Sequence, residues 1–245
     1  MDRNTLILLI AEYLGVIAVV VLAGLSPRLR PRPLKFVYPR REGIVSLTLF
    51  LVILTFAWFM QTGALGFQLV SAGDSIGESQ RHLILSAVAL LPFLAALIVR
   101  RQPLLSTGWS RAMLGPSFRL GLALAFLTIF LRGKVFALLG GISQEKAILL
   151  CLGLATCLLE ETIFRGFLQP RLMAWVGIWP GWALTAILFT VWSAVLWVGS
   201  SDNLPVVLGL ALARGLLLGW VARRSGHVLG GAMYRAVSDW CFLLG

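Results

Sequence analysis

The sequence predicts an all-α fold, a polytopic transmembrane helix bundle of about eight spans. Of its 245 residues, 59% are hydrophobic and only 13% are charged, whereas a soluble domain averages roughly a quarter charged residues. The mean hydropathy is +0.91. Apolar stretches of about 20 residues, long enough to cross the hydrocarbon core as a helix, alternate with short basic loops.

The eight apolar stretches define the predicted spans. They are residues 5–25, 43–66, 82–99, 116–131, 147–168, 179–198, 204–222 and 227–244. Glu12 lies inside the first span, which has no cleavage pattern after it, and we predict that it sits at the interface or is protonated. After the fourth span, Arg132 and Lys134 interrupt a further apolar turn that ends at Gly141, so the outer boundary of this span stays open.

Two parts are predicted along the chain. Residues 1–146 form amino-terminal helices of about four spans, with a basic cytoplasmic loop at 26–42, and residues 147–245 form a core of four more. Most of the 21 Lys and Arg residues follow odd-numbered spans, which places these loops in the cytoplasm and both termini outside. A net charge of +11 could attract nucleic acid. Membrane topology explains it better, so we predict a lipid bilayer and no nucleic-acid partner.

The stretch LLEETIFRGFLQPR, residues 158–171, carries the densest intramembrane charge. It places Glu160, Glu161 and Arg165 inside an apolar helix. A charge near the bilayer centre costs about 3 kcal/mol or more, so such groups persist when they are paired or functional. Glu161 and Arg165 are four residues apart and can pair, while Glu160 points about 100° away.

Two later spans carry polar residues at matching depth. Ser193 follows Phe189 by four residues in the sixth span, and Asp239 follows Arg235 by four in the eighth. Each lies roughly 12 to 20 Å from the cytoplasmic end of its helix, as Glu160 does. We therefore predict that Glu160, Ser193, Arg235 and Asp239 converge on one polar pocket.

These segments resemble the CPBP intramembrane peptidases, which include CAAX prenyl endopeptidases and bacterial Abi proteins. EETIFR resembles the family's EExxxR motif, Phe189 to Ser193 its FxxxH-type segment, and RGLLLGWVARRSGHVLGGAMYRAVSD its last two core helices, which end in an HxxxN-type motif. The resemblance covers residues 148–239 and implies a CPBP-type fold in a bacterial cytoplasmic membrane. It also implies a site in which the first glutamate and two histidines hold a metal ion or activate water, while the asparagine stabilises an oxyanion.

The sequence departs from that pattern at three positions. Ser193 stands at the first histidine, Arg235 at the second and Asp239 at the asparagine. A hydroxyl is a poor zinc ligand, and a guanidinium cannot ligate a metal. The chain's own histidines are His227, about 12 Å along the helix from Arg235, and His82, predicted at the outer end of the third span. No metal and no cofactor are predicted.

Charge balance suggests a different use for these residues. Three acidic and three basic side chains at depth predict a buried ion-pair network. Its members are Glu160, Glu161, Asp239, Arg165, Arg214 and Arg235.

Three functions are compatible with this network. We favour a non-catalytic member that binds other membrane proteins or serves as a structural subunit, because both motif histidines are replaced. The alternative is an active endopeptidase for prenylated or single-span substrates, with Glu160 as base and Arg235 and Asp239 in electrostatic roles. Proton or solute transport is disfavoured, since no internal repeat or broken helix pair is evident.

Smaller features have structural interpretations. The tryptophans, Trp192 among them, are expected as interfacial anchors. Gly215 and Gly219 predict close helix packing within the chain or in a dimer. The three cysteines, in apolar segments, are expected as small buried residues.

Overall fold

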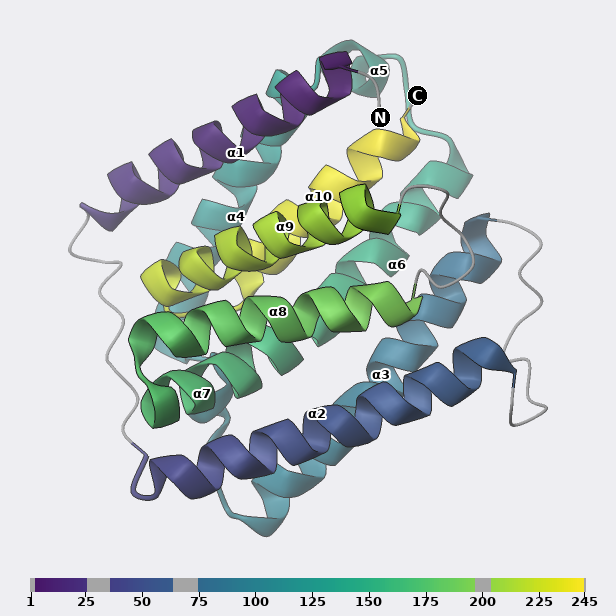
Figure 1. Ribbon diagram of the computed structural model, residues 1–245. Coiled ribbons are helices and arrows are strands. Elements are labelled where there is room, and N and C mark those ends of the chain that lie inside the picture. The colour runs from purple at the N-terminus through teal and green to yellow at the C-terminus, as the bar shows by residue number, and fades with distance from the viewer. Residues whose placement is uncertain (1–2, 26–35, 64–74, 197–203, 245) are drawn as a thin grey trace.

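The computed structural model describes residues 3–25, 36–63, 75–196 and 204–244, and its regular elements within these ranges are all helical (Figure 1). Seven helical segments are long and apolar enough to cross a membrane. The predicted all-α transmembrane bundle is therefore confirmed. Most of the basic loop at 26–42 and the polar residue Asp74 lie outside the described residues.

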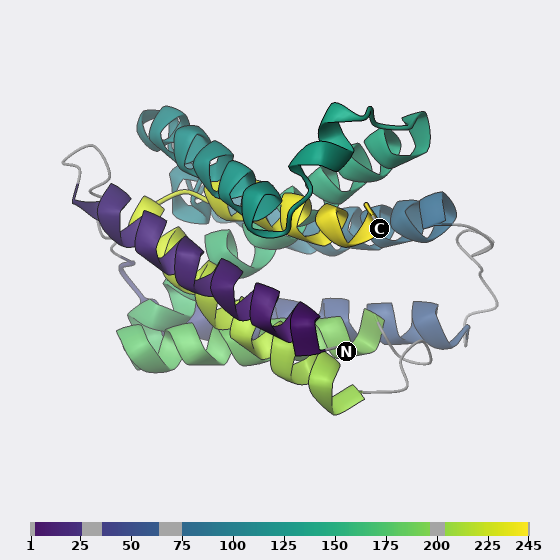
Figure 2. The same cartoon turned by 90° about the horizontal axis from the view of Figure 1, so that it is seen from above.

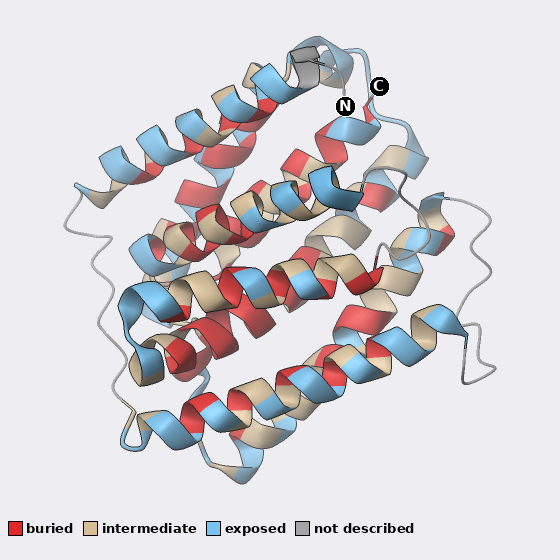
Figure 3. Ribbon diagram, in the orientation of Figure 1, coloured by how far each residue is buried: buried red, intermediate tan, exposed pale blue. Residues whose placement is uncertain are grey.

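Helices make up most of the described residues. In chain order they are α1 (Arg3–Gly24), α2 (Pro39–Thr62), α3 (Ser75–Val99), the 3₁₀ turn η1 (Leu104–Thr107), α4 (Arg111–Leu131), α5 (Val135–Leu139), α6 (Gln144–Glu161), the π-helix η2 (Thr162–Leu168), α7 (Gln169–Val176), α8 (Ile178–Leu196), α9 (Leu204–Ser225) and α10 (Leu229–Leu243). Buried residues are concentrated where the helices pack together in the middle of the bundle (Figure 3).

The third and fourth spans differ from their predicted bounds. α3 begins at Ser75, so Glu78 and Arg81 belong to the helix and not to a loop. His82 consequently lies about two turns inside α3, and the position predicted for it at the end of the span is wrong. A hydropathy pattern misses these turns because their residues are polar. The fourth span starts earlier, at Arg111, and the apolar turn after Lys134 forms the separate helix α5.

The eighth predicted span is a shorter helix than expected. α10 has 15 residues, which extend about 22 Å, while the hydrocarbon core is about 30 Å thick. It lies in the middle of the bundle, between α4 and α6 on one side and α9 on the other (Figure 2). Protein therefore covers most of α10, and eight of its residues are buried.

Both chain ends lie at the same end of the bundle, where α1 begins and α10 ends (Figure 1). The opposite end holds the start of α2, the turn from α3 to α4, and the turn from α9 to α10. Arg100, Arg101, Arg111, Arg223 and Arg224 belong to that opposite end. This arrangement agrees with termini on one side of the membrane.

The motif segment forms one continuous helical rod, α6, η2 and α7, whose middle is a π-helix. All seven residues of η2 are buried, and its aromatic rings pack edge to face against three other helices. Phe164 contacts Phe50 of α2 and Phe189 of α8, while Phe167 contacts Phe93 of α3. π-Helical turns are rare and often mark functional sites. Here the π turn anchors the charged motif among α2, α3 and α8.

The two glycines of α9 serve packing inside the chain. A Cβ at Gly215 would lie 3.2 Å from Ala186 of α8, and one at Gly219 would lie 2.9 Å from the Trp182 ring. The interpretation as close packing within the chain is confirmed. Cys157 and Cys241 are buried as expected, whereas Cys151 is exposed on the bundle surface.

Replacing Gly166 by alanine is expected to destabilise the protein. A Cβ at this position would collide with the carbonyl of Thr107 in η1, a backbone atom that cannot rotate away. Overpacking of this kind typically costs about 1 to 3 kcal/mol, so thermal unfolding in detergent should occur several degrees lower. Gly153→Ala is the control, because no atom lies within 4 Å of its Cβ position. Equal melting temperatures for the two variants would contradict the close contact of η1 with η2.

Candidate functional site

Arg235 of α10 bridges the two motif carboxylates. Glu160 and Glu161, at the end of α6, are 1% and 0% exposed. The Arg235 Nη2 atom lies 2.6 Å from Glu160 Oε2, and Nη1 lies 3.6 Å from Glu161 Oε1. The predicted pairing of Arg235 with Glu160 across the bundle is therefore observed, and Arg235 also reaches the neighbouring Glu161.

Arg165 is the second cation of the cluster. Its Nε atom lies 3.4 Å from Glu161 Oε2, which is the pairing expected from their spacing of four residues. Its Nη2 atom donates a hydrogen bond of 3.2 Å to the carbonyl of Gly215 in α9. The guanidinium also stacks 4.4 Å from the centre of the Phe189 ring. Arg165 thus connects the π turn to α9 and α8.

Asp239 and Arg214 extend the network toward the bundle surface. Arg235 Nε lies 3.8 Å from Asp239 Oδ2, and Arg214 Nη1 lies 2.6 Å from Asp239 Oδ1. All six residues of the predicted network are therefore joined by ion pairs. The Asp239 side chain is 42% exposed and that of Glu160 is 2% exposed. The network runs from the bundle interior to its outside.

Ser193 does not join this cluster. Its hydroxyl donates a hydrogen bond of 2.9 Å to the carbonyl of Phe189, one turn earlier in α8. The preceding residue, Trp192, occupies the position predicted for Ser193. Its indole N–H donates a hydrogen bond of 3.0 Å to Glu160 Oε1. Adjacent residues of an α-helix are rotated by 100° about its axis, so Trp192 faces α6 and Ser193 does not. Trp192 is buried, so its predicted role as an interfacial anchor is wrong.

α3 contributes two residues that sequence reasoning did not assign to the site. The Ser86 hydroxyl donates a hydrogen bond of 3.2 Å to Glu160 Oε1. His82, one turn earlier on α3, interacts electrostatically with Glu160 and Arg235. The only signal in the sequence was the polar pair four residues apart, His82 and Ser86, on an apolar helix.

Glu12 of α1 belongs to a neighbouring ion pair inside the bundle. It is fully buried, and Arg132 Nε donates to its Oε2 atom at 2.6 Å. The Tyr234 hydroxyl donates to Oε1 at 2.8 Å, and Arg132 Nη2 also donates to Ser238 at 3.0 Å. Glu12 therefore lies between helices and not on the bundle surface, and Arg132, the residue that follows α4, provides its counter-charge. Sequence spacing gives no hint of a pair between residues 120 positions apart.

The metal site implied by the family resemblance does not fit these residues. Among the side chains described, no three His, Cys, Asp or Glu come together as a metal site. The guanidinium of Arg235 contacts both carboxylates, and it has no lone pair to offer a cation. His227 lies in the turn before α10, where its Nδ1 atom accepts the backbone N–H of Leu229 at 3.0 Å.

The bundle and its charge cluster define a multi-pass membrane protein with an ionic site buried between helices. The family model described as Type II CAAX prenyl endopeptidase Rce1-like matches residues 142–241. This region contains EETIFR and extends to α10, so within this polytopic membrane protein residues 142–241 are similar to the Rce1-like CAAX endopeptidases. No curated protein and no solved structure matches the chain.

Arg235→Ala is expected to lower the thermal stability of the protein. Removing one partner of a buried ion pair leaves an uncompensated charge and costs about 3 to 5 kcal/mol. Adding Glu160→Gln should restore part of the loss, because the amide keeps an acceptor for Trp192 and Ser86 without the charge. Melting in detergent measures both, with the exposed Arg111→Ala as control. Arg235→Ala melting like that control would rule out a stabilising network.

The turn at His227 should make stability sensitive to mild acid. Burial lowers the pKa of His227 below its usual value of 6.5. The unfolded chain therefore binds a proton first, and stability falls as the pH drops through this value. The melting temperature should be lower at about pH 5.5 than at about pH 7.5. His227→Asn, which keeps an acceptor but cannot be protonated, should show a smaller drop; an unchanged drop would contradict this assignment.

Proposed function

We propose that this protein is a catalytically inactive member of the CAAX peptidase-like proteins, acting as a binding or structural subunit for other membrane proteins. One observation carries the proposal: Arg235 contacts both Glu160 and Glu161. A general base must be free to accept a proton, with its pKa near the working pH. In this protein the Arg235 guanidinium contacts one carboxylate oxygen of Glu160, and hydrogen bonds from Trp192 and Ser86 occupy the other.

The distribution of the charged residues supports a structural role. Ion pairs of the network link α6, α9 and α10, and the hydrogen bonds to Glu160 add α3 and α8. Each of these helices would lose a buried polar partner if its neighbour rotated or moved along its axis. A bundle held in one arrangement in this way is suited to presenting a constant surface to other membrane helices.

The membrane placement that we propose follows from charge. The end of the bundle opposite the termini carries the basic connections after α3 and α9. Basic loops favour the cytoplasm. We place this end in the cytoplasm of a bacterial cell and both termini outside.

An active glutamate-dependent endopeptidase is the alternative function. It is favoured by the partial exposure of Asp239, through which the network reaches the bundle surface. Arg235 would then stabilise an oxyanion rather than block a base. Prenylated or single-span membrane peptides would be the substrates.

A cleavage assay distinguishes the two functions. The protein and its Glu160→Gln variant are reconstituted in vesicles with prenylated CAAX peptides and with single-span substrates, and products are measured by mass spectrometry. We expect no cleavage that depends on Glu160. Glu145→Gln, an exposed carboxylate at the start of the same helix, is the matched control. Cleavage that survives in the control and disappears with Glu160→Gln would overturn the proposal.

The subunit role is tested by purification from the native membrane in mild detergent after brief crosslinking. A constant partner in stoichiometric amount is expected. Recovery of a lone monomer in repeated preparations would count against this role, whatever the outcome of the cleavage assay.

A further inference from the structure

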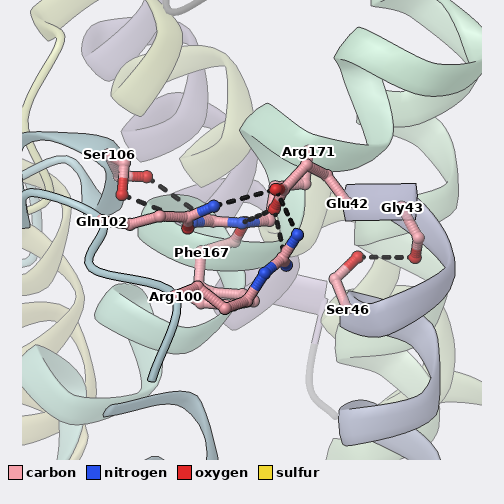
Figure 4. Close-up of polar contacts among 8 residues, drawn as sticks. All are labelled: Glu42, Gly43, Ser46, Arg100, Gln102, Ser106, Phe167 and Arg171. Carbon is pink, nitrogen blue, oxygen red and sulfur yellow. Dashed lines mark hydrogen bonds and ion pairs between the residues drawn. The ribbon is translucent and has the colours of Figure 1, made fainter. Parts of the chain in front are cut away.

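A second polar cluster lies at the basic end of the bundle, far along the chain from Arg235. Glu42, near the start of α2, accepts hydrogen bonds from three side chains (Figure 4). Arg100 Nη1 lies 2.9 Å from Glu42 Oε2, and Arg171 Nε lies 3.2 Å from the same oxygen. Gln102 donates to Oε1 at 2.8 Å. The cluster joins α2, α7 and the segment after α3.

Arg171 is the most deeply buried side chain of this cluster. It is fully buried, and its Nη1 atom donates to the carbonyls of Ser106 and Phe167 at 3.2 and 3.0 Å. Its guanidinium also stacks 3.6 Å from the centre of the Phe167 ring. Arg171 and Arg100 share the single carboxylate of Glu42. Among the residues described, no other acid pairs with these two arginines, so the cluster has a net positive charge.

A cavity of about 640 Å³ lies next to this cluster. Glu42, Arg100, Gln102 and Ser106 form its polar side. A second cavity of about 490 Å³ adjoins it, and the two share Val37, Tyr38 and Arg41 as walls. Neither is lined by a residue of the Glu160 cluster, so this is a separate feature of the molecule.

The walls of the double cavity are cationic on one side and apolar on the other. Arg40 and Arg41 are exposed, and no ion pair joins either of them to an acid in the described ranges. The apolar wall is formed by Ile44, Val45, Val99, Pro103 and Leu105. Val37 and Val99 are 84% and 81% exposed, although they flank membrane-spanning helices. A ligand that fits must therefore combine an anionic group with hydrocarbon.

We propose that this double cavity binds an anionic phospholipid. The phosphate lies between Arg41 and Arg100, and an acyl chain follows Ile44 and Val45 along α2. Guanidinium groups bind phosphate with charge-assisted hydrogen bonds, and basic pockets between membrane helices hold lipid headgroups in this way. A zwitterionic headgroup would place its own cation among the arginines, which the unpaired positive charge disfavours.

Lipid titration of the purified protein tests this site. Phosphatidylglycerol or phosphatidylcholine is added to the protein in detergent, and bound lipid is counted by native mass spectrometry. Phosphatidylglycerol should bind about tenfold more tightly, and Arg41→Gln should lower its affinity about fivefold, as expected for one basic residue at the surface.

The control variant is Arg111→Gln, which removes an exposed arginine near the same end but outside both cavities. It should leave phosphatidylglycerol binding unchanged. Equal affinity for the two lipids, or an equal loss in both variants, would overturn the proposal. In a final experiment, inorganic phosphate is added to the protein with bound phosphatidylglycerol, and it should displace the lipid only weakly. Displacement by phosphate as strong as that by added lipid would indicate a site for free anions instead.

Discussion

The arrangement of this protein depends on the contact of Arg235 with Glu160 and Glu161. Burying any one of these three side chains alone would carry a large free-energy cost. The ion pairs that Arg235 forms with both carboxylates offset this cost. The contact brings α10 against the end of α6, where the helix changes into the π turn. The ion-pair network extends from this contact to Arg165, Arg214 and Asp239. The partner of each lies on α6 or α10, the two helices that the contact joins.

Close backbone packing occurs in the helices around this contact. Gly166 allows η1 to touch η2, and Gly215 allows α9 to approach α8. These approaches carry the carbonyl of Gly215 to within hydrogen-bond distance of Arg165. The short helix α10 can remain in the centre of the bundle because α4, α6 and α9 surround it. Packing and electrostatics therefore act on the same few helices.

The two ionic clusters differ in how they meet the membrane. The Glu160 cluster is closed by hydrogen bonds from α3 and α8, and Asp239 is its most exposed member. The Glu42 cluster lines a cavity that carries an excess of arginine, as does the cavity that adjoins it. A cluster with balanced charge holds helices together, whereas one with excess charge at the level of the headgroups attracts anions. This difference is why we assign a structural role to the first and lipid binding to the second.

The sequence by itself determined the helical bundle, most of its spans, and the six residues of the Glu160 network. Apolar length indicates a span, and a buried charge needs an opposite charge, so both follow from composition and spacing. Only the tertiary structure decided that Trp192 faces Glu160 while Ser193 does not, that Ser86 joins from α3, and that Glu12 pairs with Arg132. These contacts depend on the rotation of each helix about its axis, at 100° per residue, and on which helices become neighbours. Neither quantity can be obtained from the spacing of residues within one span.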